Sequence, residues 1–139
     1  MDKLFLDTNY LFDLALDHRP GAESAEELFA LVCDGQAVAA IAPSSLKDFY
    51  YIGRQDIAED QRRAWLAFFL DAFSVVDLNR EACQRALRSD EPDFEDGIVR
   101  ALSESSHCTA IITRDLPAFA HSVVPAMSAE AYLVRRTTG

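Results

Sequence analysis

The sequence predicts an α/β fold, a three-layer α/β/α sandwich with a central parallel sheet of about five strands. Two observations predict it. Short, mostly apolar runs recur along the chain, as expected for strands buried on both faces of a parallel sheet. Longer segments with apolar residues at helical spacing separate these runs. The chain has 139 residues, of which 50% are hydrophobic, and we expect a single domain spanning 1–139.

The individual elements follow from periodicity and from breaker residues. The predicted strands occupy residues 3–6, 38–41, 74–77, 109–113 and 123–124. The predicted helices occupy residues 22–34, 43–51, 60–72, 80–88, 93–106 and 128–136. Asp7-Thr8-Asn9 ends the first strand and predicts a loop or the start of a helix. Residues 89–92, Ser-Asp-Glu-Pro, break the chain between two helices.

Nothing in the sequence predicts a membrane protein. No apolar run approaches the ~18–20 residues of a membrane span. The N-terminus has only three apolar residues before it reaches Asp7, which is unlike a signal peptide. We therefore expect a cytoplasmic protein that does not contact membranes.

The cysteines and histidines have no ligand spacing. The three cysteines lie far apart, without a C-x-x-C motif, and are predicted to be small buried thiols: Cys33, Cys83 and Cys108. The three histidines are predicted to be surface or loop residues: His18, His107 and His121.

The charge balance narrows the function classes. The chain contains 13 Lys and Arg residues and 23 Asp and Glu residues, which gives a formal net charge of −10. Such a surface repels phosphate backbones at long range, which argues against a passive nucleic-acid-binding module. It is compatible with an enzyme that reaches phosphates through divalent cations, or with one that works with a basic partner.

Several aspartates fall where a parallel sheet binds its ligands, beyond the carboxyl ends of the strands. Asp7 follows the first strand, Asp48 lies one turn into the helix after the second, and Asp115 follows the fourth. Asp93 and Asp96 open the helix that leads into the fourth strand. Clustered carboxylates repel one another, and a hard cation such as Mg²⁺ or Mn²⁺ relieves the repulsion. Such a site can activate water and stabilise charge on a scissile phosphate, which indicates phosphodiester hydrolysis.

Most of these acids also have a purely structural interpretation. Asp93 can be a helix N-cap, with Asp96 as a variant of the capping-box acid. Ser45 and Asp48 can form a similar pair, and Asp115 can be a turn residue. An acid can cap a helix and bind a metal at the same time, so the joint placement of the acids carries the hypothesis.

Five segments together resemble the motifs of PIN-domain nucleases. They are Leu4-Phe5-Leu6-Asp7-Thr8-Asn9 for the opening strand and D-T-N, Ser44-Ser45-Leu46-Lys47-Asp48 for S-x-x-x-[E/D], Asp93-Phe94-Glu95-Asp96-Gly97 for D-x-x-D-A, Ile111-Ile112-Thr113-Arg114-Asp115 for the late strand with T-R-[N/D], and Ser128-Ala129-Glu130-Ala131-Tyr132-Leu133 for the terminal helix. The match covers essentially the whole chain in the expected order.

The resemblance implies a small VapC-type toxin, an RNA endonuclease that requires Mg²⁺ or Mn²⁺, is inhibited by a cognate antitoxin and forms a homodimer. The catalytic acids it implies are Asp7, Asp48, Asp96 and Asp115. Among these, Asp7 and Asp96 would be direct metal ligands, Asp48 would act directly or through water, Asp115 is the outermost, and Asp93 is accessory. The supporting polar residues it implies are Thr8, Asn9, Ser44 and Thr113. Substrate phosphates would pass the arginines Arg54, Arg62, Arg63 or Arg114.

Two positions depart from the family pattern. Position 48 is Asp where Glu is more usual, which shortens the reach to a metal by one methylene. Gly97 stands where Ala is common, and because glycine destabilises a helix interior by about 0.5–1 kcal/mol, we expect close packing there.

Two other functions remain open from the sequence. A haloacid-dehalogenase-type phosphohydrolase also begins with a strand followed by Asp, but it needs D-x-D, and position 9 is Asn. A PIN-like module with an inactive site could serve protein interaction or RNA binding. The presence of all four acids and the charge of −10 count against that alternative.

Overall fold

A single parallel sheet forms the centre of the computed structural model, which describes residues 1–89 and 93–138. Its strands are β1 (Asp2–Leu6), β2 (Ala37–Ile41), β3 (Ser74–Val75), β4 (Ala110–Ile112) and β5 (Ala126–Met127). The spatial order is β3-β2-β1-β4-β5, and every pairing is parallel. The strand order reverses at β1, so the crevice between the carboxyl ends of β1 and β4 is the place where such folds bind ligands.

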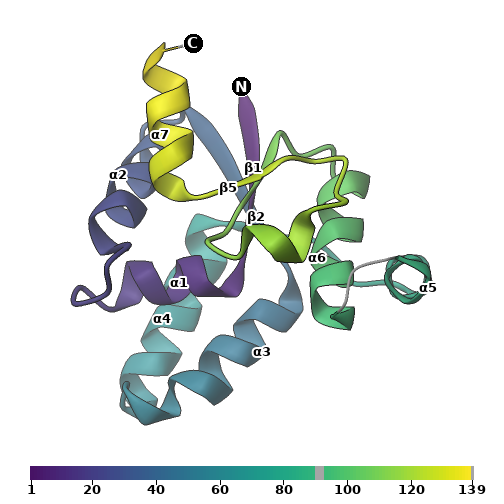
Figure 1. Cartoon of the computed structure of the whole chain (residues 1–139). Helices are drawn as coiled ribbons and strands as arrows, with labels where there is room; N and C mark the ends of the chain where they lie inside the picture. The colour runs from purple at the N-terminus through teal and green to yellow at the C-terminus, as the bar shows by residue number, and fades with distance from the viewer. Residues whose placement is uncertain (90–92, 139) are drawn as a thin grey trace.

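Helices cover both faces of the sheet, which confirms the predicted three-layer α/β/α fold (Figure 1). On one side lie α1 (Thr8–Ala15), α2 (Ala22–Cys33), α4 (Glu59–Ala72) and α7 (Ala129–Thr138). On the other lie α5 (Arg80–Arg88) and α6 (Phe94–Ser105). Helix α3 (Pro43–Ile52) follows β2 and packs against α1 and α4. The short 3-10 helices are η1 (Gly53–Gln55) and η2 (Leu116–Phe119).

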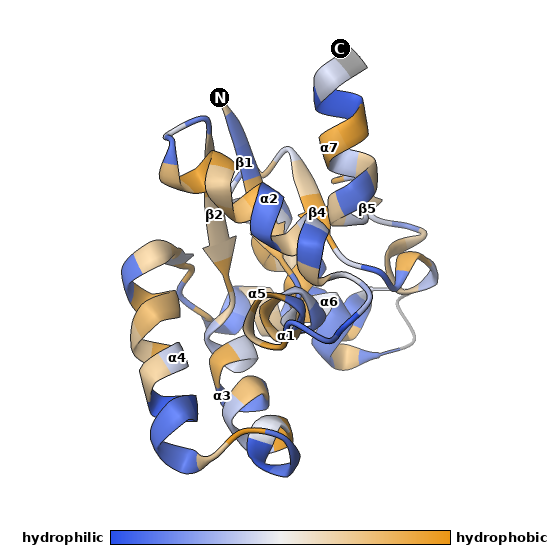
Figure 2. Ribbon diagram, turned by 90° about the vertical axis from the view of Figure 1, so that its left-hand side faces the viewer, coloured by the Kyte–Doolittle hydropathy of each residue, from blue (hydrophilic) through white to orange (hydrophobic). Residues whose placement is uncertain are grey.

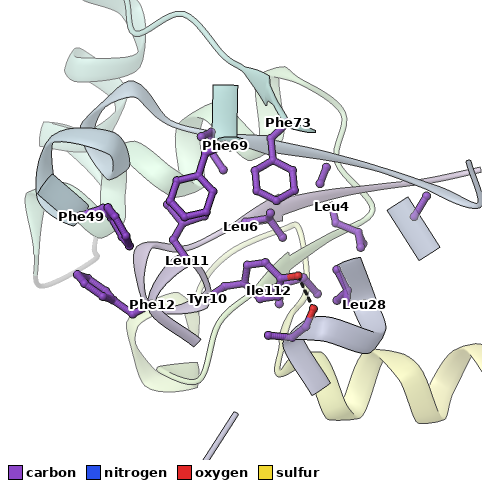
Figure 3. Packing of buried hydrophobic residues seen from close by; sticks show 14 of the residues in the cluster. Leu4, Leu6, Tyr10, Leu11, Phe12, Leu28, Phe49, Phe69, Phe73 and Ile112 are labelled. Atoms are coloured by element: carbon purple, nitrogen blue, oxygen red, sulfur yellow. Dashed lines mark hydrogen bonds between the residues drawn. The ribbon is translucent and has the colours of Figure 1, made fainter. Parts of the chain in front are cut away.

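Two hydrophobic cores result from the alternation of side chains along the strands. Leu4 and Leu6 of β1 face the first core, whereas Phe5 between them faces the second. Figure 3 shows the first core, in which Phe49 of α3 stacks on Phe12 at 4.8 Å between ring centroids and meets Phe69 edge-on at 5.0 Å. Because Phe49 is fully buried, this aromatic cluster fixes α3, and with it the neighbouring Asp48.

The second core includes a close approach between α5 and α6 at Gly97. A Cβ atom added at Gly97 would lie 3.1 Å from both Cα and Cβ of Ala86. The absence of a side chain therefore lets the two helices meet, as the departure at this position led us to expect. The close contact fixes the N-terminal end of α6, which carries Asp96.

The strands are apolar throughout their buried parts, as the sequence patterns require. Figure 2 shows β2 and β4 in apolar colours, whereas α3 and α4 carry both hydrophobic and hydrophilic residues. In the part of the chain that the structure describes, no helix combines the length and the apolar character needed to cross a membrane.

Some predicted elements were misplaced or too long. The fifth strand is Ala126–Met127 and not 123–124, because the backbone of residues 125–127 pairs with β4: Ile111 donates to the Pro125 carbonyl and Thr113 to the Met127 carbonyl, both at 2.9 Å. Strands β3 and β4 are shorter than predicted. The loop or helix start after β1 is a full helix, α1. Of the predicted break at 89–92, only Ser89 belongs to the described residues.

The cysteines also differ from the prediction. Only Cys108 is buried; Cys33 is exposed at the end of α2, and Cys83 is partly exposed. Cys33 lies at the exposed end of α2, and the hydrophobic character of a small thiol is not sufficient to bury it there. The three histidines are all exposed, as expected.

Candidate active site

Asp7 lies at the carboxyl end of the central strand and is the N-cap of α1. Its Oδ1 accepts a hydrogen bond from the Thr8 backbone N–H at 2.8 Å, and its Oδ2 accepts one from the Thr113 hydroxyl at 2.9 Å. Both carboxylate oxygens are thus oriented by donors from the ends of β1 and β4. Asp7 therefore caps α1 and also links the start of this helix to the end of β4.

The environment of Asp7 disfavours its charge. Burial raises the pKa of this carboxyl, and the negative charges of Asp115 and Asp48 raise it further. The hydrogen bonds from Thr113 and Thr8 act in the opposite direction, but the net pKa remains above the ordinary value. An additional positive charge at this position would therefore stabilise the ionised carboxylate.

Thr113 connects the predicted acids through a buried hydroxyl. Its side chain is 1% exposed, donates to Asp7 and accepts the Asp115 backbone N–H at 3.0 Å. On the opposite side, the Thr8 hydroxyl donates to Oγ of Ser45 at 3.0 Å, and Ser45 is 2% exposed. The serine that bonds to Thr8 is therefore Ser45, whereas the sequence pointed to its neighbour Ser44. Asn9 lies half-buried in the first turn of α1.

Asp48 belongs to a second group of charges along α3 and α6. Its carboxylate pairs with the exposed Lys47 at 3.8 Å and repels Asp7. Partial burial, followed by the charges of Asp48 and Asp93, raises the pKa of Glu95, and a side-chain hydrogen bond between Glu95 and Asp48 favours the protonated Glu95. The prediction did not include Glu95, because spacing alone does not show which acid of the first turn of α6 approaches α3.

The two aspartates at the start of α6 have different positions. Asp93 is the N-cap, and its Oδ1 accepts the Glu95 backbone N–H at 2.8 Å, so its structural interpretation is confirmed. Asp96 is half-buried in the first turn, directly before the close-packed Gly97. Asp115 is exposed and precedes η2 without capping it through its side chain.

The donor set suits a hard divalent cation that keeps some of its water. Among residues 1–89 and 93–138, no three His, Cys, Asp or Glu side chains lie close enough together to hold a metal ion. Mg²⁺, however, is commonly bound by one or two carboxylates with the remaining positions taken by water and substrate phosphate. The half-buried Asp7, with two further carboxylates repelling it, offers oxygen ligands and an unbalanced negative charge that such a cation would compensate.

The arginines predicted to guide phosphates have other partners. Arg62 is buried, donates from Nη1 to the Tyr50 carbonyl at 2.7 Å and lies over the Tyr50 ring, so its predicted contact with substrate is wrong. Arg114 pairs with Asp13 at 2.9 Å. Arg54 lies over the Tyr51 ring, and the exposed Arg63 pairs with Glu59. Of these, Arg114 is next to the predicted acids in sequence.

Fold and site together define a PIN-like α/β protein with acidic residues near the reversal point of its sheet. A family model for the PIN domain matches residues 3–117, and the chain belongs to this family. The match contains every one of the predicted site residues. No curated protein sequence matches the chain significantly.

Solved structures share the fold at low sequence identity. The chain resembles a structure described as VapBC2 from Rickettsia felis bound to a DNA fragment from its promoter, with a TM-score of 0.69, 15% identity, and coverage of 91% of this chain and 98% of the other. It also resembles Mycobacterium tuberculosis VapC20, described as a Sarcin-Ricin loop cleaving toxin, with a TM-score of 0.68, 16% identity, and coverage of 86% and 96%. A third similar structure is a protein from Pyrobaculum aerophilum, with a TM-score of 0.66, 17% identity, and coverage of 99% and 91%.

Proposed function

We propose that the chain is an endoribonuclease that depends on Mg²⁺ or Mn²⁺ and hydrolyses RNA phosphodiester bonds. The observation that carries the proposal is the state of Asp7. This carboxylate is half-buried at the carboxyl end of the central strand, and Asp48 and Asp115 lie close enough to raise its pKa. The mutual repulsion of these acids opposes folding, and the hydrogen bonds to Asp7 offset it only in part, whereas a bound cation would compensate the charge.

The proposed roles of the acids follow their positions. Asp7 and Asp96 would hold the cation directly, Asp48 and Asp115 would complete the site directly or through water, and Asp93 would be accessory. When bound, the cation would lower the pKa of water and offset the charge that develops on the scissile phosphate. Thr113 and the Thr8 backbone fix the two Asp7 oxygens, so the ligand geometry is set before substrate arrives.

The choice of RNA and the biological role come from the similar structures. One of them is described as a toxin that cleaves the Sarcin-Ricin loop, and another as a VapBC complex on promoter DNA. We extend these properties to the present chain as the toxin of a toxin–antitoxin pair, acting in the cytoplasm as a homodimer. A net charge of −10 suits a partner that places Arg or Lys near the acidic residues of the site.

The alternative function, an inactive PIN-like module for protein interaction or RNA binding, has one specific observation in its favour. No three metal-ligating side chains converge among the described residues. The two functions differ in one result, since only a nuclease cleaves RNA when a divalent cation is added.

Cleavage of a structured RNA tests the proposal. We would incubate a mixture of total RNA with the wild type in Mn²⁺ and in EDTA, and with the variants Asp7→Asn and Asp96→Asn in Mn²⁺. We expect cleavage by the wild type in Mn²⁺ alone and a loss of at least ~100-fold in both variants. The matched control is Asp34→Asn, an exposed aspartate at the end of α2. Full activity of Asp96→Asn, or cleavage in EDTA, would contradict the assigned roles.

A further inference from the structure

Asp13 is a buried carboxylate that the proposed chemistry does not use. It lies on α1, its side chain is 7% exposed, and its Oδ1 accepts hydrogen bonds from two guanidinium groups. Nε of Arg19 lies at 2.7 Å and Nη2 of Arg114 at 2.9 Å. The second oxygen faces Gly21, where an added Cβ would lie 2.3 Å from Oδ2. The carboxylate is thus enclosed by α1, the connection to α2 and the segment after β4.

Two consecutive residues attach the segment after β4 to the two halves of α1. Thr113 donates to Asp7 at the N-terminal end of the helix, and Arg114 donates to Asp13 near its C-terminal end. Six residues of helix separate the two acids, a rise of about 9 Å. The segment is therefore held at two points, and this fixes its orientation along the helix as well as its distance from it.

The second attachment matters because it holds the exposed end of the segment. Arg114 and Asp115 are exposed, and the Asp115 backbone N–H is bonded to the Thr113 hydroxyl. The pairing also explains why Arg114, although adjacent to Asp115 in sequence, is not among the charges that act on Asp7. Its guanidinium donates to Asp13, which lies near the C-terminal end of α1, whereas Asp7 caps the N-terminal end.

We propose that Asp13 is a positioning residue, which holds Arg114 and thereby fixes the segment from Thr113 to Asp115 against α1. Its catalytic consequence rests on the proposed nuclease function, because Asp7 and Asp115 must keep their relative positions to act on one phosphate. Small displacements of catalytic groups are sufficient to reduce rates by up to about 100-fold.

A set of matched variants separates this role from simple stabilisation. Asp13→Asn and Arg114→Gln each break the attachment, and Arg114→Gln retains the Asp13–Arg19 ion pair in case Asp13→Asn does not fold. The control is Arg19→Gln, which removes a guanidinium from the same oxygen without touching the segment. Arg19 is the less exposed partner, at 28% against 40% for Arg114, and also lies over the Phe12 ring. Arg19→Gln should therefore lower the unfolding temperature at least as much as Arg114→Gln does.

Two measurements provide the test. Hydrogen exchange of the Asp115 amide reports the segment directly and requires no activity, and we expect it to accelerate roughly tenfold in Asp13→Asn and Arg114→Gln but not in Arg19→Gln. In RNA cleavage with Mn²⁺, we expect kcat to fall about 10- to 100-fold in the same two variants with KM within about twofold. The double variant should be no slower than either single variant, because both changes break one interaction.

Different outcomes overturn the inference and the proposed function separately. Equal effects of Arg19→Gln and Arg114→Gln on hydrogen exchange and kcat would show that Asp13 stabilises the fold and has no positioning role. An increase in KM in Arg114→Gln alone, additive with Asp13→Asn, would mean that Arg114 contacts the substrate directly. If the wild type does not cleave RNA but the exchange pattern is as expected, the positioning role stands and the nuclease function fails.

Discussion

Replacing Thr113 by valine tests the hydrogen bonds that hold Asp7, since valine has nearly the shape of threonine and lacks only the hydroxyl. That hydroxyl is buried, donates to Oδ2 of Asp7 and accepts the Asp115 N–H. A hydrogen bond to a charged group contributes about 1.5–3 kcal/mol. We therefore expect Thr113→Val to lower the free energy of unfolding by about 2 kcal/mol at pH 7 without added metal. This corresponds to a fall in Tm of roughly 8 °C for a domain of this size.

The effect of Thr113→Val should depend on pH in a defined direction. Without the Thr113 donor, the already raised pKa of Asp7 rises further. A carboxyl whose folded pKa lies above its unfolded value destabilises the fold above the folded pKa. This cost falls as the pH drops below the folded pKa and is gone below the unfolded pKa. The difference from wild type should therefore shrink to about 1 kcal/mol, the contribution of a neutral hydrogen bond, once Asp7 is protonated.

Urea unfolding of wild type and variant between pH 7 and pH 3.5 measures both effects. Thr109→Val is the matched control, because its exposed hydroxyl only accepts the Lys3 backbone N–H at 3.1 Å and lies far from any acid of the site. We expect it to cost less than about 1 kcal/mol at every pH. If Thr113→Val is no more costly than Thr109→Val, or its cost is constant with pH, the description of the Asp7 environment is wrong.

Three further predictions follow from the same contacts. In EDTA at pH 7, Asp7→Asn should be more stable than wild type, because asparagine also caps helices and removes a carboxyl whose pKa is raised by burial. The gap should shrink as the pH drops below that pKa and close below the unfolded pKa of Asp, whereas a variant less stable at pH 7 would contradict this. Gly97→Ala should lower stability by about 1 kcal/mol in urea unfolding, because overpacking against the Ala86 backbone costs about 1–3 kcal/mol and outweighs the helix propensity gained, whereas a stabilised variant would show that α5 yields. Gly21→Ala should cost about 2 kcal/mol or more, since its Cβ must displace the buried Asp13 carboxylate, and calorimetry showing an unchanged Tm would rule out the enclosed geometry.

The sequence determined the fold class well because buried parallel strands leave a simple pattern. Leu4, Phe5 and Leu6 must all be apolar, since the two faces of β1 contribute to two different cores. The same pattern misplaced the last strand, because Val123 and Val124 are hydrophobic but the ladder uses backbone groups of residues 125–127. Backbone pairing at an edge strand leaves no strong signal in side-chain hydrophobicity.

The sequence predicted where several of the candidate residues lie in the fold but not what they contact. Strand ends placed Asp7, Thr113 and Asp115 at one edge of the sheet, and the structure brings these three together. The partner of Arg114 could not be predicted, since it lies 101 residues away on α1. Helical spacing likewise could not show that Glu95 approaches Asp48. The single-domain prediction and the roles of the individual acids remain predictions.

The central claim is that the carboxylates at the ends of β1 and β4 form one cation-binding site, and thermal unfolding with and without Mn²⁺ tests it most directly. A cation at about 100 times its dissociation constant stabilises a native protein by about 2.7 kcal/mol. We predict that wild type and the Asp34→Asn control gain this stability on transfer from EDTA to Mn²⁺, whereas Asp7→Asn begins more stable in EDTA and gains little. An equal response of all three proteins, or no response in wild type, would contradict the claim and leave these acids as helix caps and surface charges.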